Sequence, residues 1–185
     1  MHRIAHAILG FAIAFLFTRP VCAAVNDSAA NGFSVVEKVH IAAPPARVYE
    51  EVVTPAHWWS SLHTFSGSAA NLTLDPKAGG CWCETLPGGG SVLHLNVVFA
   101  DPAKTLVMRG ALGPLQRLGV EGALTISLKP AEDGTDMSLT YNVGGYLKDG
   151  LASWAAPVDA VLGDQVARLK SLIETGTPDL RAESH

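Results

Sequence analysis

The sequence predicts an α+β domain in which a curved antiparallel sheet wraps around one long C-terminal helix. Two patterns carry this prediction. Between Phe33 and Val143, most segments alternate apolar and polar residues with the period of two that half-buried strands show. Residues 157–176 instead carry one apolar stripe at helical spacing. A succession of strands followed by an amphipathic helix is typical of an α+β domain, because the sheet can bury the stripe.

A first strand and two short helices open the predicted domain. The strand covers residues 33–41, and Glu37 is the one acidic residue on its apolar face. Pro44-Pro45 ends the strand and begins a helix that we expect to run to Thr54, since proline is tolerated in a first helical turn. A second short helix follows over residues 54–59, with Thr54 as its N-cap.

Strands and turns occupy most of the chain from there to the long helix. We expect the strands at residues 72–75, 81–86, 92–100, 105–110, 121–128 and 137–143. The apolar segment 111–120 is either a lid over a cavity or a packed crossover. The long helix has Pro157 in its first turn and ends at Gly176, and a polar tail follows at residues 177–185.

Residues 1–24 have the pattern of a secretory signal peptide. A short basic start precedes an apolar run over residues 4–17, which is shorter than the roughly 20 residues that a membrane-spanning helix needs. Arg19-Pro20 breaks this run, and small residues follow it. We expect cleavage after Ala23 or Ala24, no stable membrane insertion after cleavage, and a periplasmic or secreted protein.

The remaining chain is long enough for one domain with a hydrophobic core. Residues 25–32 are small and polar, and we interpret them as a flexible lead-in to a single domain over residues 33–176. Loss of the signal segment would move the formal net charge from −4 to −6, because the segment carries Arg3 and Arg19 and no acid. This acidity, with scattered lysines and arginines, excludes a nucleic-acid partner, which needs a clustered basic face.

Four short segments are similar to the START-like, or SRPBCC, superfamily. They are residues 41–49 (IAAPPARVY), 54–59 (TPAHWW), 76–82 (PKAGGCW) and 168–170 (RLK). Their order and spacing resemble the branch of the activator of heat-shock-protein ATPase, which neighbours the polyketide cyclases. The resemblance covers residues 33–176 and implies a helix-grip fold with a hydrophobic cavity under the long helix.

The resemblance does not imply one function. The superfamily contains lipid carriers, hormone receptors, cyclases, ring-opening enzymes and chaperone cofactors, so the fold alone cannot choose among them. The predicted export signal argues against the chaperone role, since an exported domain would not meet a cytosolic chaperone.

Cys81 and Cys83 lie two residues apart on a predicted strand and therefore share a face, with Trp82 on the other. Three interpretations stay open: packed thiols, a disulfide, or a metal pair completed by His57 or His63. We favour packed thiols, because residues two apart on a strand are about 6.6–6.8 Å apart, at the upper edge of the distance that a disulfide spans.

Glu37 and Glu84 are the candidate catalytic groups. Each lies on a strand face shared with apolar side chains, and a buried carboxylate is costly unless it is paired. Arg109 and Arg117 are candidates to pair with them, and a rim position for both glutamates is the simpler alternative. The sequence has no HExxH motif, no serine elbow and no Gly-rich phosphate loop, and we expect no cofactor.

Aromatic side chains are the candidate walls of the cavity, because they supply apolar area with a polar tip. With the polar candidates, the predicted ligand-binding set is Trp58, Trp59, Trp82, Glu84, Arg109, Tyr141 and Trp154. Core packing is the alternative for each aromatic residue.

Three functions are compatible with these features. The first is an exported protein that binds a small apolar molecule, such as a lipid, a polyketide or an aromatic compound. The second is an enzyme of the cyclase, dehydratase or hydrolase kind, in which Glu37 or Glu84 is a general base whose pKa is raised by burial. The third is an envelope stress or interaction module that uses the Trp58-Trp59 region as its partner surface.

Overall fold

The computed structural model describes residues 22–180. Most of the predicted signal peptide and the end of the predicted polar tail lie outside the described residues. Within them, the helices and strands are β1 (Cys22–Ala29), β2 (Gly32–Ile41), α1 (Pro45–Val52), η1 (Pro55–His57), η2 (Ser61–His63), η3 (Ala69–Asn71), β3 (Leu72–Leu74), β4 (Cys81–Thr85), η4 (Pro87–Gly89), β5 (Ser91–Asp101), β6 (Thr105–Arg109), η5 (Gly113–Arg117), β7 (Gly119–Ala131), β8 (Gly134–Tyr146), η6 (Ala152–Trp154) and α2 (Ala155–Thr175).

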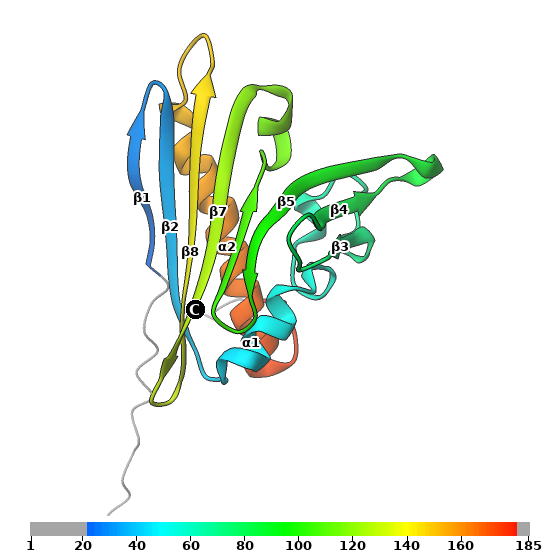
Figure 1. Cartoon of the computed structure of the whole chain (residues 1–185), viewed down its shortest axis with the longest axis vertical. Coiled ribbons are helices and arrows are strands. Elements are labelled where there is room, and N and C mark those ends of the chain that lie inside the picture. The colour runs from blue at the N-terminus through cyan, green and yellow to red at the C-terminus, as the bar shows by residue number, and fades with distance from the viewer. Residues whose placement is uncertain (1–21, 181–185) are drawn as a thin grey trace, which may run out of the picture.

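The strands form one antiparallel sheet in the order β1-β2-β8-β7-β6-β5-β4-β3. Figure 1 shows β1, β2, β8 and β7 standing side by side with α2 along one face, while β5 sweeps away with β4 and β3. The long helix packs against β2 and β1. The structure therefore confirms the α+β helix-grip fold, a curved sheet around a C-terminal helix.

The core fills the space between the sheet and α2. Alternate residues of the central strands are buried, and so is the apolar stripe of α2, as in Val35, Leu124, Leu139, Leu162, Val166 and Leu169. Gly176 ends α2 with φ at 82°, and its N–H donates to Leu172 O at 2.9 Å. This left-handed cap is the stop that the sequence predicts.

The prediction of a flexible lead-in at residues 25–32 is wrong. Residues 22–29 form β1, which pairs with β2 from Cys22 opposite Lys38 to Ala29 opposite Gly32. Pairing at a sheet edge uses backbone N–H and C=O groups, so small polar side chains can form it without an alternating apolar pattern. Residues 25–30 are accordingly exposed although their backbone is part of the sheet.

The second predicted short helix is also shorter than expected. Only Pro55–His57 form a single 3₁₀ turn, in which Trp58 and Trp59 N–H groups both donate to Pro55 O. A turn of this kind brings the two tryptophans inward without a full helix. Among residues 22–180, no helix has the length and apolar character to cross a membrane.

Glu37 occupies the buried face of β2, so the rim position that we consider the simpler alternative for the two glutamates is wrong. The side chain of Glu37 is 0% exposed, and no N–H or hydroxyl donor among residues 22–180 reaches its carboxylate oxygens, which leaves the Asp159 carboxyl as the group that can share its proton. Burial, followed by the charge of Asp159 on α2, raises the pKa of Glu37 to about 7. Glu37 and Asp159 thus form an acidic pair between the sheet and the helix.

This pair predicts a pH-dependent stability that Glu37→Gln removes. Because the folded chain holds a proton on Glu37 up to about pH 7 and the unfolded chain releases it near 4.5, the wild type loses stability as pH rises through this window. The amide is neutral throughout, so the free energy of unfolding of the variant minus that of the wild type should rise by about 1–3 kcal/mol between pH 4.5 and 8. Urea unfolding at both pH values measures this difference.

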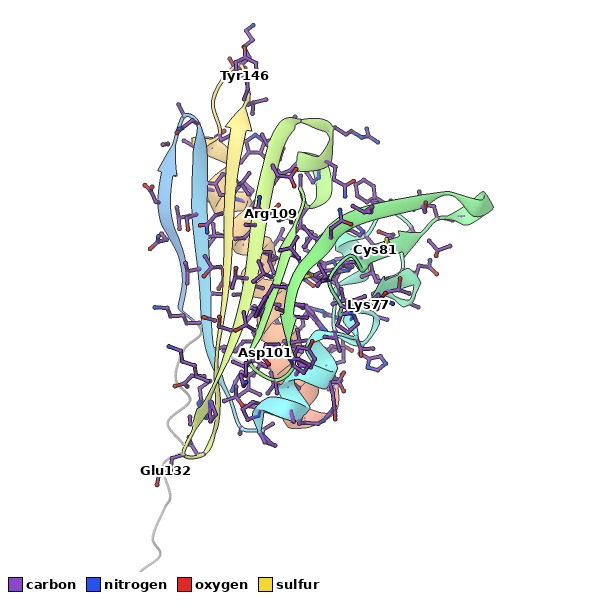
Figure 2. The ribbon with its side chains drawn as sticks, in the orientation of Figure 1. Lys77, Cys81, Asp101, Arg109, Glu132 and Tyr146 are labelled. Carbon is purple, nitrogen blue, oxygen red and sulfur yellow. A yellow bond between two sulfur atoms is a disulfide. The ribbon has the colours of Figure 1, made fainter. Side chains whose placement is uncertain are left out.

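The control is Glu132→Gln, at the exposed tip of the β7–β8 turn (Figure 2). The free energy of unfolding of this variant minus that of the wild type should not change with pH. If the free energies of unfolding of Glu37→Gln and the wild type differ by the same amount at pH 4.5 and pH 8, the buried acidic pair is contradicted.

Candidate functional site

An apolar pocket of about 470 Å³ lies beside the first half of α2. Its walls come from α2, the segment before β3, strands β4 and β5, and the segment before β7. The apolar lining includes Trp59, Phe65, Leu72, Trp82, Trp154 and Leu162, and the polar lining consists of His63, Thr64, His94 and Arg117. A cavity of this size and composition is typical of sites for small organic ligands.

Three of the predicted ligand-binding residues, Trp59, Trp82 and Trp154, line this pocket. Trp59 and Trp82 meet edge to face, with ring centroids 4.9 Å apart. Trp59 Nε1 donates to His63 O at 2.9 Å, which ties its ring to the segment that forms the rim. The walls are therefore held in place by their own packing and hydrogen bonds.

Trp58 belongs to the core instead of the pocket. It is 2% exposed, and its Nε1 donates to Glu51 O at 2.7 Å. Trp59 is also buried, at 8% exposed. The prediction that the Trp58-Trp59 region is an exposed partner surface is therefore wrong, because the 3₁₀ turn at Pro55 directs both rings inward.

Arg109 does not line the pocket and contacts neither candidate glutamate. It lies at the exposed end of β6, where the alternation that buries Leu106 and Met108 turns it outward (Figure 2). Arg117, which the sequence offers only as a pairing candidate, is exposed and lines the pocket.

Tyr141 supports the pocket from outside. Its hydroxyl donates to Gly110 O and accepts from Leu112 N–H, both at 3.0 Å, and burial raises its pKa to about 12. Gly122 faces its ring so closely that a Cβ there would come within 2.5 Å of it. Tyr141 thus anchors the start of the segment that we predict as a lid or a crossover.

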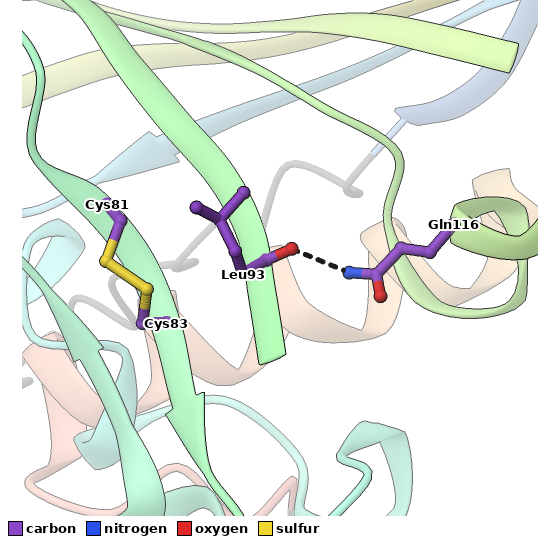
Figure 3. The surroundings of a disulfide bond; sticks show 4 residues. All are labelled: Cys81, Cys83, Leu93 and Gln116. Carbon is purple, nitrogen blue, oxygen red and sulfur yellow. Dashed lines mark hydrogen bonds between the residues drawn. A yellow bond between two sulfur atoms is a disulfide. The ribbon is translucent and has the colours of Figure 1, made fainter. Parts of the chain in front are cut away.

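That segment, residues 111–120, both packs and lines the pocket. Leu115 is buried in the core, while Leu112 and Pro114 face the cavity. Gln116 Nε2 donates to Leu93 O at 3.0 Å, which ties η5 to β5 (Figure 3). The segment is therefore a packed wall of the pocket.

Glu84 lies one layer behind the pocket, hydrogen-bonded to a residue that the sequence analysis did not select. Its Oε2 is 2.9 Å from Nε2 of His94, and both side chains are buried. Backbone N–H groups of Phe65 and Ser66 also donate to Glu84. Burial raises the pKa of Glu84, but the hydrogen bonds from Ser66, Phe65 and His94 together outweigh it and lower the pKa below its usual value. The expectation of a raised pKa is wrong for Glu84.

His94 reaches the pocket because β5 carries a β-bulge there. Trp82 pairs with Leu95 and Cys83 with Leu93, so His94 is an extra residue on β5. A bulge re-aims a side chain, and His94 and Leu95 are accordingly buried side by side in sequence, whereas Leu93 is 50% exposed. The strict alternation that we expect in β5 is broken at this residue.

His63 also has a buried polar partner that could not be recognised from the sequence. Gln165 on α2 is 0% exposed, and its Nε2 lies 3.0 Å from Nδ1 of His63. Its Oε1 accepts from Ser60 N–H at 2.7 Å, which fixes the orientation of the amide. The one signal for Gln165 in the sequence is a polar residue inside the apolar stripe of the long helix.

Cys81 and Cys83 form a disulfide, so the prediction of packed thiols is wrong (Figure 3). Their Cα atoms are 5.5 Å apart, closer than on a regular strand, because this part of β4 lies opposite the bulge of β5. Both sulfurs are used, His57 bonds Glu51 at 2.9 Å, and His63 bonds Gln165. Residues 22–180 contain no cluster of three or more side chains that could hold a metal ion.

Glu37 is absent from the pocket lining. Of the two candidate glutamates, Glu84 is the one with a hydrogen bond to a described residue that lines the cavity, His94. The structure thus combines an apolar pocket with two histidines, each held from behind by a buried polar side chain.

Solved structures share the fold at low sequence identity. Protein MLL2253 from Mesorhizobium loti is 19% identical, with a TM-score of 0.56 over 80% of this chain and 99% of that one. CalU16 from Micromonospora echinospora is 15% identical, with a TM-score of 0.55 over 87% and 88%. DynU16, a protein in the dynemicin biosynthetic locus, is 24% identical, with a TM-score of 0.54 over 78% of this chain and 48% of that one.

No curated protein matches the chain with significant similarity. One family model does, and it is described as polyketide cyclase / dehydrase and lipid transport. The match runs over residues 32–174, from the start of β2 almost to the end of α2. It agrees with the START-like fold, the cavity under the long helix and the solved structures. The chain therefore belongs to the polyketide cyclase / dehydrase and lipid transport family of the START-like superfamily.

Proposed function

We propose that this protein is exported and binds one small hydrophobic molecule, a lipid, a polyketide or an aromatic compound, in the pocket beside α2. The observation that carries the proposal is the 470 Å³ cavity with three tryptophans in its wall. Burial of apolar ligand surface against such walls supplies roughly 25 cal/mol per Å², enough for affinity without any charged contact. The family description, which names lipid transport and polyketide cyclisation, supports the same class of ligand.

Two observations support export. The first 24 residues have the basic, apolar and small-residue order of a signal peptide. The Cys81–Cys83 disulfide suits an oxidising compartment such as the periplasm or the extracellular space. Cleavage after Ala23 or Ala24 would leave the pairing of Val25–Ala29 with β2 in place.

Expression of the full chain in a bacterial host tests export directly. The intact mass of protein from the periplasmic fraction or the medium should correspond to a chain that begins at Ala24 or Val25. It should also be about two mass units below the reduced chain, because the disulfide removes two hydrogens. Uncleaved protein in the membrane fraction would contradict the proposal.

Native mass spectrometry of protein purified from its own host should show a bound small molecule that organic extraction releases.

Val158→Trp, on the face of α2 that lines the pocket, should fill the cavity and weaken binding of anilinonaphthalene sulfonate at least about tenfold in a fluorescence titration. Val98→Trp is the matched control, since Val98 is 46% exposed on β5 and lies outside the lining. Equal probe affinity in Val158→Trp and the wild type would exclude this pocket as the binding site.

The anchor at Tyr141 predicts a kinetic effect on the bound probe. Tyr141→Phe removes the hydroxyl that holds Gly110 and Leu112, and should destabilise the fold by roughly 1–3 kcal/mol. The wall segment should then open more often and release the same fluorescent probe faster in stopped-flow displacement. Tyr146→Phe is the control, because Tyr146 is 77% exposed. An unchanged release rate in Tyr141→Phe would show that the segment does not control access.

A further inference from the structure

The Cys81–Cys83 bridge is a disulfide on which the fold does not depend. It joins residues two positions apart, so it closes a very short ring and removes little freedom from the unfolded chain. Backbone pairing holds β4 on both sides, to β3 and to β5, and Trp82 packs edge to face on Trp59. The bridge can therefore open while β4 keeps its place in the sheet.

Cys81 and Cys83 can be reached from outside the molecule. Both are partly exposed, and they project from the face of β4 opposite the buried Trp82 (Figure 3). β3 covers this edge of the sheet only briefly, since its pairing with β4 ends where Leu74 lies opposite Trp82. A thiolate exchanges with a disulfide only where it has access to a sulfur atom, and this face of β4 gives that access.

The spacing of a regular strand favours the reduced form of the pair. The Cα atoms of Cys81 and Cys83 are 5.5 Å apart in the bridged chain, whereas residues two apart on a regular strand are separated by about 6.6–6.8 Å. Opening the bridge lets β4 take the regular spacing. A disulfide whose reduced form is stabilised by its own protein oxidises other thiols, and an exposed bridge is reduced more easily than a buried structural one.

We propose that the Cys81–Cys83 bridge is a thiol–disulfide exchange site whose substrate is a dithiol, a pair of cysteine thiols in another exported protein. Neither cysteine lines the pocket, so this inference shares with the proposed function only the exported location and needs no bound ligand. A dithiol suits the site better than a single thiol does, because its second thiol is held beside the mixed disulfide and completes the exchange.

The exchange balances between the bridge and the dithiol. One thiolate of the dithiol attacks a sulfur of the bridge, the S–S bond breaks, and the other cysteine leaves as a thiolate that takes up a proton. The second thiolate of the dithiol then attacks the mixed disulfide, which forms the disulfide of the substrate and releases the second cysteine. Two electrons and two protons pass from the dithiol to Cys81 and Cys83, and no further oxidant is consumed.

Reduction of the folded protein by dithiothreitol tests the access to the bridge. The protein carries Cys22→Ser, so that two cysteines remain whether or not the signal segment is cleaved. Thiols trapped with iodoacetamide and counted by intact mass should appear in the folded protein at a rate within about tenfold of the rate in the same chain unfolded in urea. The reduced protein should still unfold cooperatively. A slower folded rate than this, or loss of the fold on reduction, would overturn the proposal.

Transfer to a dithiol is measured with a reduced synthetic peptide whose two cysteines are separated by four residues. In about tenfold excess of this peptide without oxygen, at least about half of the bridges should open, and one peptide disulfide should form for each bridge lost. The double variant Cys81→Ser/Cys83→Ser should form no peptide disulfide, and Glu132→Gln, at an exposed turn, should match the wild type. A bridge that persists at equilibrium in most of the chains would exclude this activity.

A failure of the proposed function would look different. Binding of anilinonaphthalene sulfonate reports the pocket and the mass of the exported chain reports signal cleavage, and neither enters the two exchange measurements. An exported protein with an empty pocket would still exchange with the peptide. A ligand-binding protein with an inert bridge would contradict the exchange site alone.

Discussion

The curvature of β5 is the constraint on which the rest of the molecule depends. The long helix packs against β2 and β1, and the bend of the sheet brings β4 and β5 round to form another wall of the pocket beside it. β5 carries two extra residues, His94 opposite β4 and Val98 opposite β6, and each bulge bends and twists the strand. The sweep of β5 in Figure 1 carries β4 and β3 away from the long strands and leaves room for the pocket.

The first of these bulges also places a polar side chain in the pocket wall. His94 is the residue that the first bulge adds, so the device that bends the sheet also turns an imidazole toward the cavity. On the other side of the ladder, β4 brings Trp82 to the pocket wall and Glu84 behind His94. The Cys81–Cys83 bridge spans Trp82 on the opposite face of that strand. It closes a ring of three residues, so chain entropy alone gives it only about 1–2 kcal/mol of stabilisation.

Buried polar groups in this fold divide into two kinds. Glu84 and Gln165 are fully hydrogen-bonded and hold histidines of the pocket, which is how a buried polar network positions a functional group. Glu37 and Asp159 instead meet as two carboxyl groups between β2 and α2, and burial favours the neutral form of Glu37. This pair lies outside the pocket lining. Ionisation of Glu37 therefore destabilises the packing of α2 on the sheet and does not act on the pocket.

The class of fold, the strand periodicity and the cap at Gly176 could be predicted from the sequence, because each follows from local spacing along one chain. The same spacing placed Glu37 and Glu84 on apolar strand faces, but their burial instead of a rim position became clear only in the folded structure. The sequence also indicated Trp59, Trp82 and Trp154 as cavity residues through a family resemblance. The pairing of β1, the disulfide, and the hydrogen bonds of His94 and Gln165 could not be predicted from the sequence. These depend on register between strands and on contacts across the core, and a bulge that shifts register by one residue leaves no local trace in the sequence.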